Sequence, residues 1–365
     1  MIKEIHVKNF KCFEDFLLPV KNINVLTGIN GMGKSTIIQS LLLLRQSFRR
    51  NGDMKGLDLN GGYISLGNAK DVLYEKADDE KLGLGFTDET GEYFWEYGYS
   101  PESDFMPVLN TVLYKYGGIN ETGLFGRGFS YLSAYRIQPQ DLYGIQNEEE
   151  TKQREFGNNG KFSLQYLDAY GDKEIKNKNV VINDKMGSSL RNQVHVWLDR
   201  IAPGVSPQIT VNMQLRNLEL RYEFIEGREK TGFYKSVNTG FGITYVLPLI
   251  IAILSAEKGD IIIVENPEAH IHPAGQRMLG ELISCAGAGG VQMIIETHSD
   301  HIINGLRLSV KKKTVLPEDI ELSFFYKDSS YCHMCLHPKI LEDGRLDSWP
   351  EGFFDEWDKA LYEMI

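Results

Sequence analysis

The order of apolar and polar residues at the start of the chain predicts three strands and a helix. Apolar side chains alternate with polar ones at the N-terminus, and two further apolar stretches follow. The expected strands are Met1–Val7, Phe13–Val20 and Ile23–Leu26. An apolar helix, Ile37–Leu44, is expected after a glycine-rich loop and should end near Arg49-Arg50.

Short strand-like runs separated by glycines follow this helix and predict an antiparallel β layer. They are Tyr63–Leu66, Val72–Tyr74, Leu82–Phe86 and Tyr93–Tyr99. Asp88–Gly91 is a good hairpin turn between the last two runs.

The segment Ser100–Asn192 is the least regular part of the chain. It has several glycine clusters and the charged run Glu148–Glu155. Tyr131–Ile137 is strand-like and contains Arg136 near its end. We interpret the segment as an insertion that is helical in part, with a mobile acidic stretch near residues 146–160.

Regular alternation of strands and helices returns after Gln193 and predicts a parallel α/β sheet. The expected helices are Val194–Ile201, Gly242–Ala256 (which contains Pro248) and Ala274–Ser284. The expected strands are Ile209–Val211, Leu215–Phe224, Ile261–Val264 and Val291–Ile295. A β meander over Glu321–Tyr326, Tyr331–Leu336 and Leu346 and an aromatic tail, Trp349–Phe354, close the chain.

Composition and charge narrow the class of protein. The 365 residues are 42% hydrophobic, as in ordinary globular proteins, and can hold one large or two ordinary domains. The net charge of −11 excludes a global attraction to nucleic acid, although a local basic patch remains open. The longest apolar run, near Val246–Leu254, is too short to span a bilayer, and four cysteines predict no disulfide framework. We expect a cytoplasmic protein.

The glycine-rich loop carries the full motif Gly28-x-x-x-x-Gly33-Lys34-Ser35 between an expected strand and an expected helix. Backbone N–H groups of such a loop wrap phosphates, the lysine neutralises their charge, and the serine hydroxyl binds Mg²⁺. A chance glycine-rich turn is the alternative, and the strand–loop–helix context argues against it. The expected nucleotide-binding residues are Gly28, Asn30, Gly31, Gly33, Lys34, Ser35 and Thr36.

Two buried strands end in polar residues that suit a Mg²⁺–phosphate site. Glu265 and Glu268 follow one strand, and His298 follows the other. Glu265 would hold Mg²⁺ together with Ser35, and Glu268 would act as the general base on the attacking water. His298 lies at the strand end where α/β proteins bind ligands and would contact the γ-phosphate. An exposed acidic turn and a structural histidine are the plainer alternatives.

A second pair of glycines, in Thr239-Gly240-Phe241-Gly242, precedes a long apolar helix. Glycines before a helix form an anion-binding N-terminus. One chain needs only one such cradle for phosphate. The second therefore suggests a surface that docks on a nucleotide held by another subunit.

These motifs together resemble the ABC ATPase heads of the RecF/SMC branch and, more narrowly, stand-alone bacterial AAA-type ATPases grouped with OLD and Septu-type phage-defence ATPases. The likeness covers Met1–Leu44 and about Phe233–Ile303 closely. It implies an α/β fold: an ABC-ATPase head with a P-loop parallel or mixed sheet, an antiparallel β layer and an inserted α-rich segment. The expected division is residues 1–99 and 193–365 for the two parts of the head and 100–192 for the insertion.

The resemblance also implies roles for single residues. Lys34 and Ser35 correspond to Walker A, Glu265 and Glu268 to Walker B and the catalytic glutamate, and His298 to the switch histidine. The residues at the signature position, which contacts ATP across a head-to-tail dimer, are Asn238, Gly240 and Gly242. The chain departs from the family pattern in three ways: it lacks Leu-Ser-Gly-Gly-Gln, it has glutamate where Walker B usually has aspartate, and it has no clear Q-loop glutamine, Gln138 and Gln140 being weak candidates.

The function implied is a Mg²⁺-dependent ATPase whose ATP-bound homodimer, or higher homo-oligomer, switches a separately encoded nuclease or toxin in phage defence or nucleic-acid surveillance. The alternatives are an OLD-like nuclease system, a DNA-binding ATPase of the SMC/RecF kind, a transporter subunit and a small-molecule kinase. We expect 67 residues after His298 to be too few for a nuclease domain. No coiled coil or basic groove supports a DNA clamp, and no membrane partner is expected.

Cys332-x-x-Cys335, with His333 and His337 nearby, suggests zinc. On a strand, however, the two cysteines would point to opposite faces, which argues against chelation. His270 and His272 have no third ligand nearby and more simply shape the loop after their strand.

Overall fold

The computed structural model describes residues 1–115, 118, 122–182, 184–226 and 229–364, which fall into two compact units. The first unit comprises Met1–Arg127, Ile320–Lys339 and Leu346–Ile365, and the second comprises Gly128–Asp319 and Ile340–Arg345. These limits differ from the three-part division expected from the sequence, which stays a prediction. The segment Ser100–Asn192 contributes strands to both units, because it contains β7 (Phe105–Lys115) and β8 (Phe129–Leu132).

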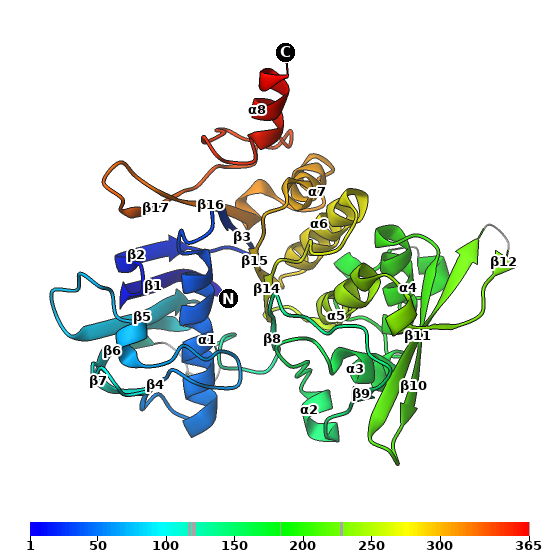
Figure 1. Cartoon of the computed structure of the whole chain (residues 1–365), viewed down its shortest axis with the longest axis horizontal. Helices are drawn as coiled ribbons and strands as arrows, with labels where there is room; N and C mark the ends of the chain where they lie inside the picture. Colours follow the sequence, from blue (N-terminus) through cyan, green and yellow to red (C-terminus); the bar gives the residue numbers. More distant parts are fainter. Residues whose placement is uncertain (116–117, 119–121, 183, 227–228, 365) are drawn as a thin grey trace. The chain divides into compact units, whose positions relative to one another are not determined.

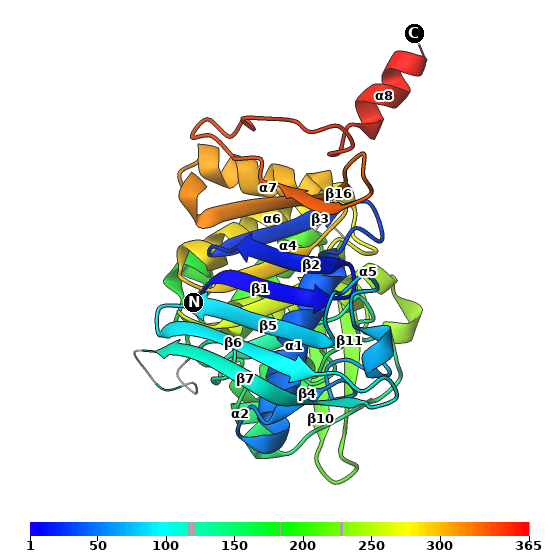
Figure 2. The same ribbon diagram turned by 90° about the vertical axis from the view of Figure 1, so that its left-hand side faces the viewer.

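An antiparallel sheet of order β2-β1-β5-β6-β7-β4 forms one layer of the first unit (Figure 2). Its other strands are β1 (Ile2–Phe10), β2 (Phe13–Pro19), β4 (Gly56–Asp58), β5 (Lys81–Asp88) and β6 (Gly91–Gly98). The predicted hairpin is confirmed, since Asp88 lies opposite Gly91. The predicted strands Tyr63–Leu66 and Val72–Tyr74 are wrong: they make only isolated bridges at Ser65 and Leu73, because such short runs between turns find no continuous partner.

The helix α1 (Lys34–Asn51) packs on one face of this sheet (Figure 2). Its apolar residues Ile37, Ile38 and Leu41–Leu44 are fully buried. The helix ends at Gly52 in a left-handed conformation, after Arg49 and Arg50, whose positive charge favours a helix C-terminus.

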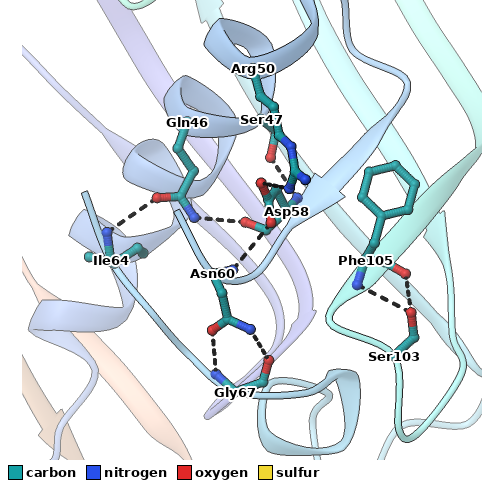
Figure 3. Close-up of polar contacts among 9 residues, drawn as sticks. All are labelled: Gln46, Ser47, Arg50, Asp58, Asn60, Ile64, Gly67, Ser103 and Phe105. Carbon is teal, nitrogen blue, oxygen red and sulfur yellow. Dashed lines mark hydrogen bonds and ion pairs between the residues drawn. The ribbon is translucent and has the colours of Figure 1, made fainter. Parts of the chain in front are cut away.

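Polar side chains of the second half of α1 hold the buried end of β4 (Figure 3). Gln46 Nε2 donates to the carbonyl of Asp58 at 2.7 Å, and its Oε1 accepts from the Ile64 amide at 3.2 Å. Ser47 Oγ accepts from the Asp58 amide at 2.8 Å, and Arg50 pairs with the Asp58 carboxylate. The loop from β4 is therefore attached to the helix that begins at the P-loop.

We expect Gln46→Met to lower the free energy of unfolding by about 2 kcal/mol. The Gln46 side chain is only 5% exposed, and without its amide the Asp58 carbonyl and the Ile64 amide lose their hydrogen-bond partner. Urea unfolding followed by tryptophan fluorescence, to which the buried Trp95 of the same unit contributes, measures this. Lys70→Ala, which removes only an exposed pair with Glu102, is the control and should leave the midpoint unchanged. An unchanged midpoint for Gln46→Met would contradict the prediction.

A second group of strands in the first unit positions the P-loop. β3 (Ile23–Gly28) runs parallel to β16 (Ile320–Lys327), and β17 (His333–Leu336) is antiparallel to β16. The predicted closing meander is therefore wrong in part, because β16 pairs with a strand about 300 positions earlier and residue 346 lies in no strand. The short helix α8 (Glu356–Glu363) follows and was not predicted.

The second unit contains three parallel strands, with β14 (Ile261–Glu265) between β8 and β15 (Gln292–Glu296). The predicted parallel α/β arrangement is confirmed. Helices of this unit are α2 (Glu148–Lys152), α3 (Ser163–Tyr170), α4 (Leu190–Ile201), α5 (Phe241–Ser255), α6 (Pro273–Ala288) and α7 (Asp300–Lys311). In Figure 1, α6 and α7 lie side by side, in agreement with their many contacts.

A small antiparallel sheet completes the second unit. Its strands are β9 (Tyr143–Gly144), β10 (Val205–Asn212), β11 (Asn217–Glu226), β12 (Glu229–Lys230) and β13 (Tyr234–Lys235). The strands predicted around Ile209 and Leu220 are confirmed: the first is longer than predicted, and the second has the predicted length but begins two residues later. In the part of the chain that the structure describes, no helix is long and apolar enough to cross a membrane.

Candidate nucleotide site and its catalytic residues

The P-loop backbone requires glycine at two of its predicted positions. Gly28 ends β3 with φ 128°, and a Cβ there would lie 2.2 Å from the carbonyl oxygen of Phe325 on β16. Gly33 has φ 108°, and a Cβ there would lie 2.4 Å from the ring of Phe13. No L-side chain fits at either position without moving its neighbour, so both glycines are explained by the fold.

The end of α1 that faces the loop carries positive charge and no competing side chain. Lys34 is 3% exposed, and its Nζ donates to the carbonyls of Gly28 at 2.8 Å and Ile29 at 2.9 Å. The helix is capped by Gly33 without a side-chain hydrogen bond, and its first turn has no acidic residue. An uncapped helix N-terminus beside an ammonium group can hold phosphate oxygens.

The other predicted P-loop residues surround this helix start. Asn30 and Gly31 are exposed in the loop, and nothing lies within 4 Å of a Cβ built on Gly31. Ser35 is exposed in the first turn of α1. Thr36 is 8% exposed, and its Oγ1 lies 3.7 Å from the Sγ of Cys12.

Glu265 is the last residue of β14, and both of its carboxylate oxygens are held within the second unit. The hydroxyl of Tyr131 donates to Oε1 at 3.1 Å, and the amide of Ala134 donates to Oε2 at 3.2 Å. Burial and the nearby Glu265 charge raise the pKa of Tyr131, so the phenol stays protonated and acts as a donor. The carboxylate is therefore fixed in direction, as a metal ligand needs to be.

The loop that follows β14, from Glu265 to His270, is the acidic loop. Its residue Glu268 joins this loop to the end of β15. The hydroxyl of Thr297 donates to its Oε2 at 2.7 Å, and the amide of His298 donates to its Oε1 at 2.8 Å. The amide of Asn266 also donates to the carbonyl of Glu296 at 2.8 Å. Two predicted site residues, Glu268 and His298, are thus brought into direct contact. Sequence patterns did not point to Thr297, whose side chain is fully buried.

The predicted signature residues differ in their surroundings. Asn238 and Gly240 are exposed, and nothing lies within 4 Å of a Cβ built on Gly240, the N-cap of α5. A Cβ on Gly242, by contrast, would lie 2.1 Å from the carbonyl oxygen of His270. The need for glycine at 242 is therefore explained by packing on the loop after Glu268, whereas packing does not explain Gly240.

The cysteines and histidines that suggested zinc make contacts with other groups or are exposed. Cys332 is exposed before β17, and Cys335 lies on that strand, where burial raises the pKa of its thiol to about 12. His333 Nδ1 lies 3.2 Å from the carbonyl of Met32, and His337 Nδ1 lies 2.8 Å from Glu321 Oε1. Within the described residues, no three His, Cys, Asp or Glu side chains are grouped as metal ligands.

The P-loop belongs to the first unit, and Glu265, Glu268, His298 and the glycines of α5 belong to the second. Each set is well formed within its own unit. That the P-loop and these residues of the second unit form one nucleotide site stays a prediction.

Comparison with known proteins identifies the family. The chain matches the family described as AAA ATPase domain over residues 1–88 and 145–303, which is more than half of its length. Residues 315–364 match a family described as a protein of unknown function (DUF3696).

One curated relative and several solved structures are similar to the chain. An OLD nuclease of Thermus scotoductus is 23% identical over 330 residues, and the match covers 82% of this chain but only 59% of the relative. An SMC head bound to the C-winged helix domain of ScpA has a TM-score of 0.51 at 11% identity. This match covers 93% of the present chain and 98% of the SMC chain. The SMC head domain from Thermotoga maritima, at 12% identity, has a TM-score of 0.44 and covers 92% of this chain and 98% of its own.

The predicted family and fold class are therefore confirmed. The chain belongs to the AAA ATPase domain family and has a mixed α/β fold like that of the SMC ATPase heads.

Proposed function

We propose that this protein is a Mg²⁺-dependent ATPase whose ATP-bound dimer switches a separately encoded effector. In this proposal Lys34 and the N-terminus of α1 bind the phosphates, while Ser35 and Glu265 hold Mg²⁺. Glu268 accepts the proton of the attacking water, and His298 contacts the γ-phosphate. The donor set fits the metal, because Mg²⁺ prefers hydroxyl, carboxylate and water oxygens.

The contact of Glu268 with Thr297 and His298 is the observation that carries the proposal. A carboxylate that accepts one hydrogen bond on each oxygen keeps a lone pair on each for a further proton. The same contact fixes the backbone of the proposed switch histidine. A structural acidic turn would not need a carboxylate that joins two strand ends beside a histidine. The match to the AAA ATPase domain family supports ATP as the substrate.

The dimeric part of the proposal rests on the element before α5. Asn238, Gly240 and Phe241 are exposed together at the start of this helix, which has no side-chain cap and no acid in its first turn. Such an element can contact the phosphates of a nucleotide bound by a second copy. The effector, a nuclease or toxin in phage defence or nucleic-acid surveillance, is proposed from the likeness to the OLD and Septu-type ATPases. The relative's nuclease activity belongs to a protein of which this chain spans 59%.

The experiment that tests the proposal measures phosphate release from ATP by the purified chain. Hydrolysis should require Mg²⁺, stop with a chelator and return when Mg²⁺ is added again. Lys34→Ala should weaken ATP binding by about tenfold or more, because the ammonium no longer neutralises the phosphates. Lys8→Ala, on the sheet of the same unit, is the control and should bind ATP normally. Absence of Mg²⁺-dependent hydrolysis in the parent protein would refute the proposal.

A further inference from the structure

A buried arginine, Arg136, lies against the acidic loop, and no motif assigns it a role. It follows β8 and is only 3% exposed. Its Nη2 donates to the backbone carbonyl of Glu265, whereas Nε and Nη1 have no hydrogen-bond partner among the described residues. Burial lowers the pKa of Arg136 to about 10, and the charges of Glu268 and Glu265 oppose that shift, so the group stays a cation at neutral pH.

A buried cation with two unused donors is unfavourable for folding. Each buried donor left without a partner lowers the free energy of unfolding, and an apolar side chain of similar size avoids that cost. Residues that break a packing rule in this way are concentrated at functional sites. Its place beside Glu265 makes Arg136 a candidate for a role in the chemistry of the acidic loop.

Tyr245, in the second turn of α5, holds the segment that contains Arg136. Its hydroxyl donates to the carbonyl of Ala134 and accepts from the Arg136 amide at 3.3 Å. Its ring centroid lies 5.0 Å from the guanidinium carbon of Arg136, a cation–π distance. The Ala134 amide in turn donates to Glu265 Oε2 at 3.2 Å. A continuous set of contacts therefore runs from α5 to the Glu265 carboxylate.

The first turn of α5 also contacts the loop that follows Glu268 directly. Gly242 meets the carbonyl of His270, two residues after Glu268, at a distance that admits no side chain. The rings of Phe241 and Tyr245 lie 6.2 Å and 5.3 Å from the His270 ring. The start of α5 thus contacts the loop after Glu268 directly and reaches Glu265 through the segment that contains Ala134 and Arg136. The contact between Gly242 and the His270 carbonyl leaves no free space at that point, so a shift of the start of α5 toward the loop must move this carbonyl.

We propose that Arg136 and Tyr245 are positioning residues that couple the glycine element at the start of α5 (Asn238 to Gly242) to the acidic loop of the same chain. The proposal rests on the proposed function, in which the glycine element contacts the nucleotide of the partner subunit while the acidic loop serves the nucleotide of its own chain. When the start of α5 contacts the partner's nucleotide, this end of the helix shifts. The contacts of Tyr245 with Ala134 and Arg136 then displace Glu265. Binding of ATP at one site then sets the geometry of the acids at the other, so hydrolysis is cooperative in ATP.

Three variants of the full-length protein test this coupling through hydrolysis rate against ATP concentration, ATP affinity and thermal unfolding. Arg136→Met should lower kcat by about tenfold or more and change ATP affinity by less than about threefold. Its unfolding temperature should stay the same or rise, because the unused donors are gone. Tyr245→Phe keeps the ring but removes the hydroxyl, and should bring the Hill coefficient from above 1 in the parent to about 1. Arg136→Lys keeps the charge and should recover part of the rate.

A matched control is Arg154→Met, since Arg154 is a half-buried arginine of the same unit that pairs with Asp260 at 2.6 Å. This variant should lose stability, because it leaves a buried carboxylate without its partner. If Arg136→Met is destabilised like Arg154→Met, the arginine has a structural role and the inference is wrong. It is also wrong if the parent hydrolyses ATP without cooperativity, or if Tyr245→Phe keeps the parental Hill coefficient. A parent that hydrolyses no ATP would instead refute the proposed function.

Discussion

Replacing Glu268 with glutamine is expected to reduce ATP hydrolysis by about a hundredfold or more while ATP still binds. The amide of glutamine cannot accept the proton of the attacking water, which removes the general base. The local structure should survive, because the glutamine Oε1 can accept from the His298 amide and its Nε2 can donate to the Thr297 hydroxyl. Phosphate release and binding of a fluorescent ATP analogue measure the two quantities on the same preparation.

Glu150→Gln, which changes an exposed acid on α2 in the same unit, is the matched control and should hydrolyse ATP like the parent. The Glu268 variant is also expected to accumulate as an ATP-bound dimer, because the γ-phosphate gripped by both subunits is no longer removed. If the variant hydrolysed ATP at the parental rate, Glu268 would not be the base and the acid would have to be sought elsewhere in the chain.

Mixing two inactive variants is expected to restore activity, at most about a quarter of the parental level, if the site is shared between subunits. One variant is Lys34→Ala, and the other is Gly240→Glu, which places a negative charge where the partner's phosphates are expected. Half of the randomly exchanged dimers contain both variants, and each of these has one intact site. The structure selects Gly240 for this test, because space is open around it, whereas any side chain at Gly242 collides with His270.

The mixing experiment needs evidence that subunits exchange, which differently tagged variants supply through co-purification. A Gly240→Ala variant controls for the loss of glycine itself and should stay active, because Gly240 has φ −62° and ψ 137°, a conformation that alanine adopts. Two outcomes would contradict the shared site: variants that exchange but stay inactive together, and a Gly240→Glu variant that is fully active alone.

Several features of the protein were determined by local sequence. The P-loop was recognisable because its strand, its glycines and its helix are adjacent in the chain, and the positive φ values of Gly28 and Gly33 are local requirements of the backbone. Glu265 was placed at a strand end by the four apolar residues before it, since a fully buried strand of a parallel sheet reads as a continuous apolar run. The antiparallel hairpin at Asp88–Gly91 was also predictable, because its turn residues are adjacent in the chain.

Contacts between distant residues were decided only by the tertiary structure. The pairing of β16 with β3, the attachment of Glu268 to Thr297 and His298, and the burial of Arg136 against Glu265 join residues that are from 29 to about 300 positions apart. Alternation and turn signals report only which face of an element is buried, and many partners satisfy the same pattern. The requirement for glycine at 242 shows the difference most clearly. The sequence suggested a phosphate contact there, whereas the fold brings the carbonyl of His270 so close that no side chain fits.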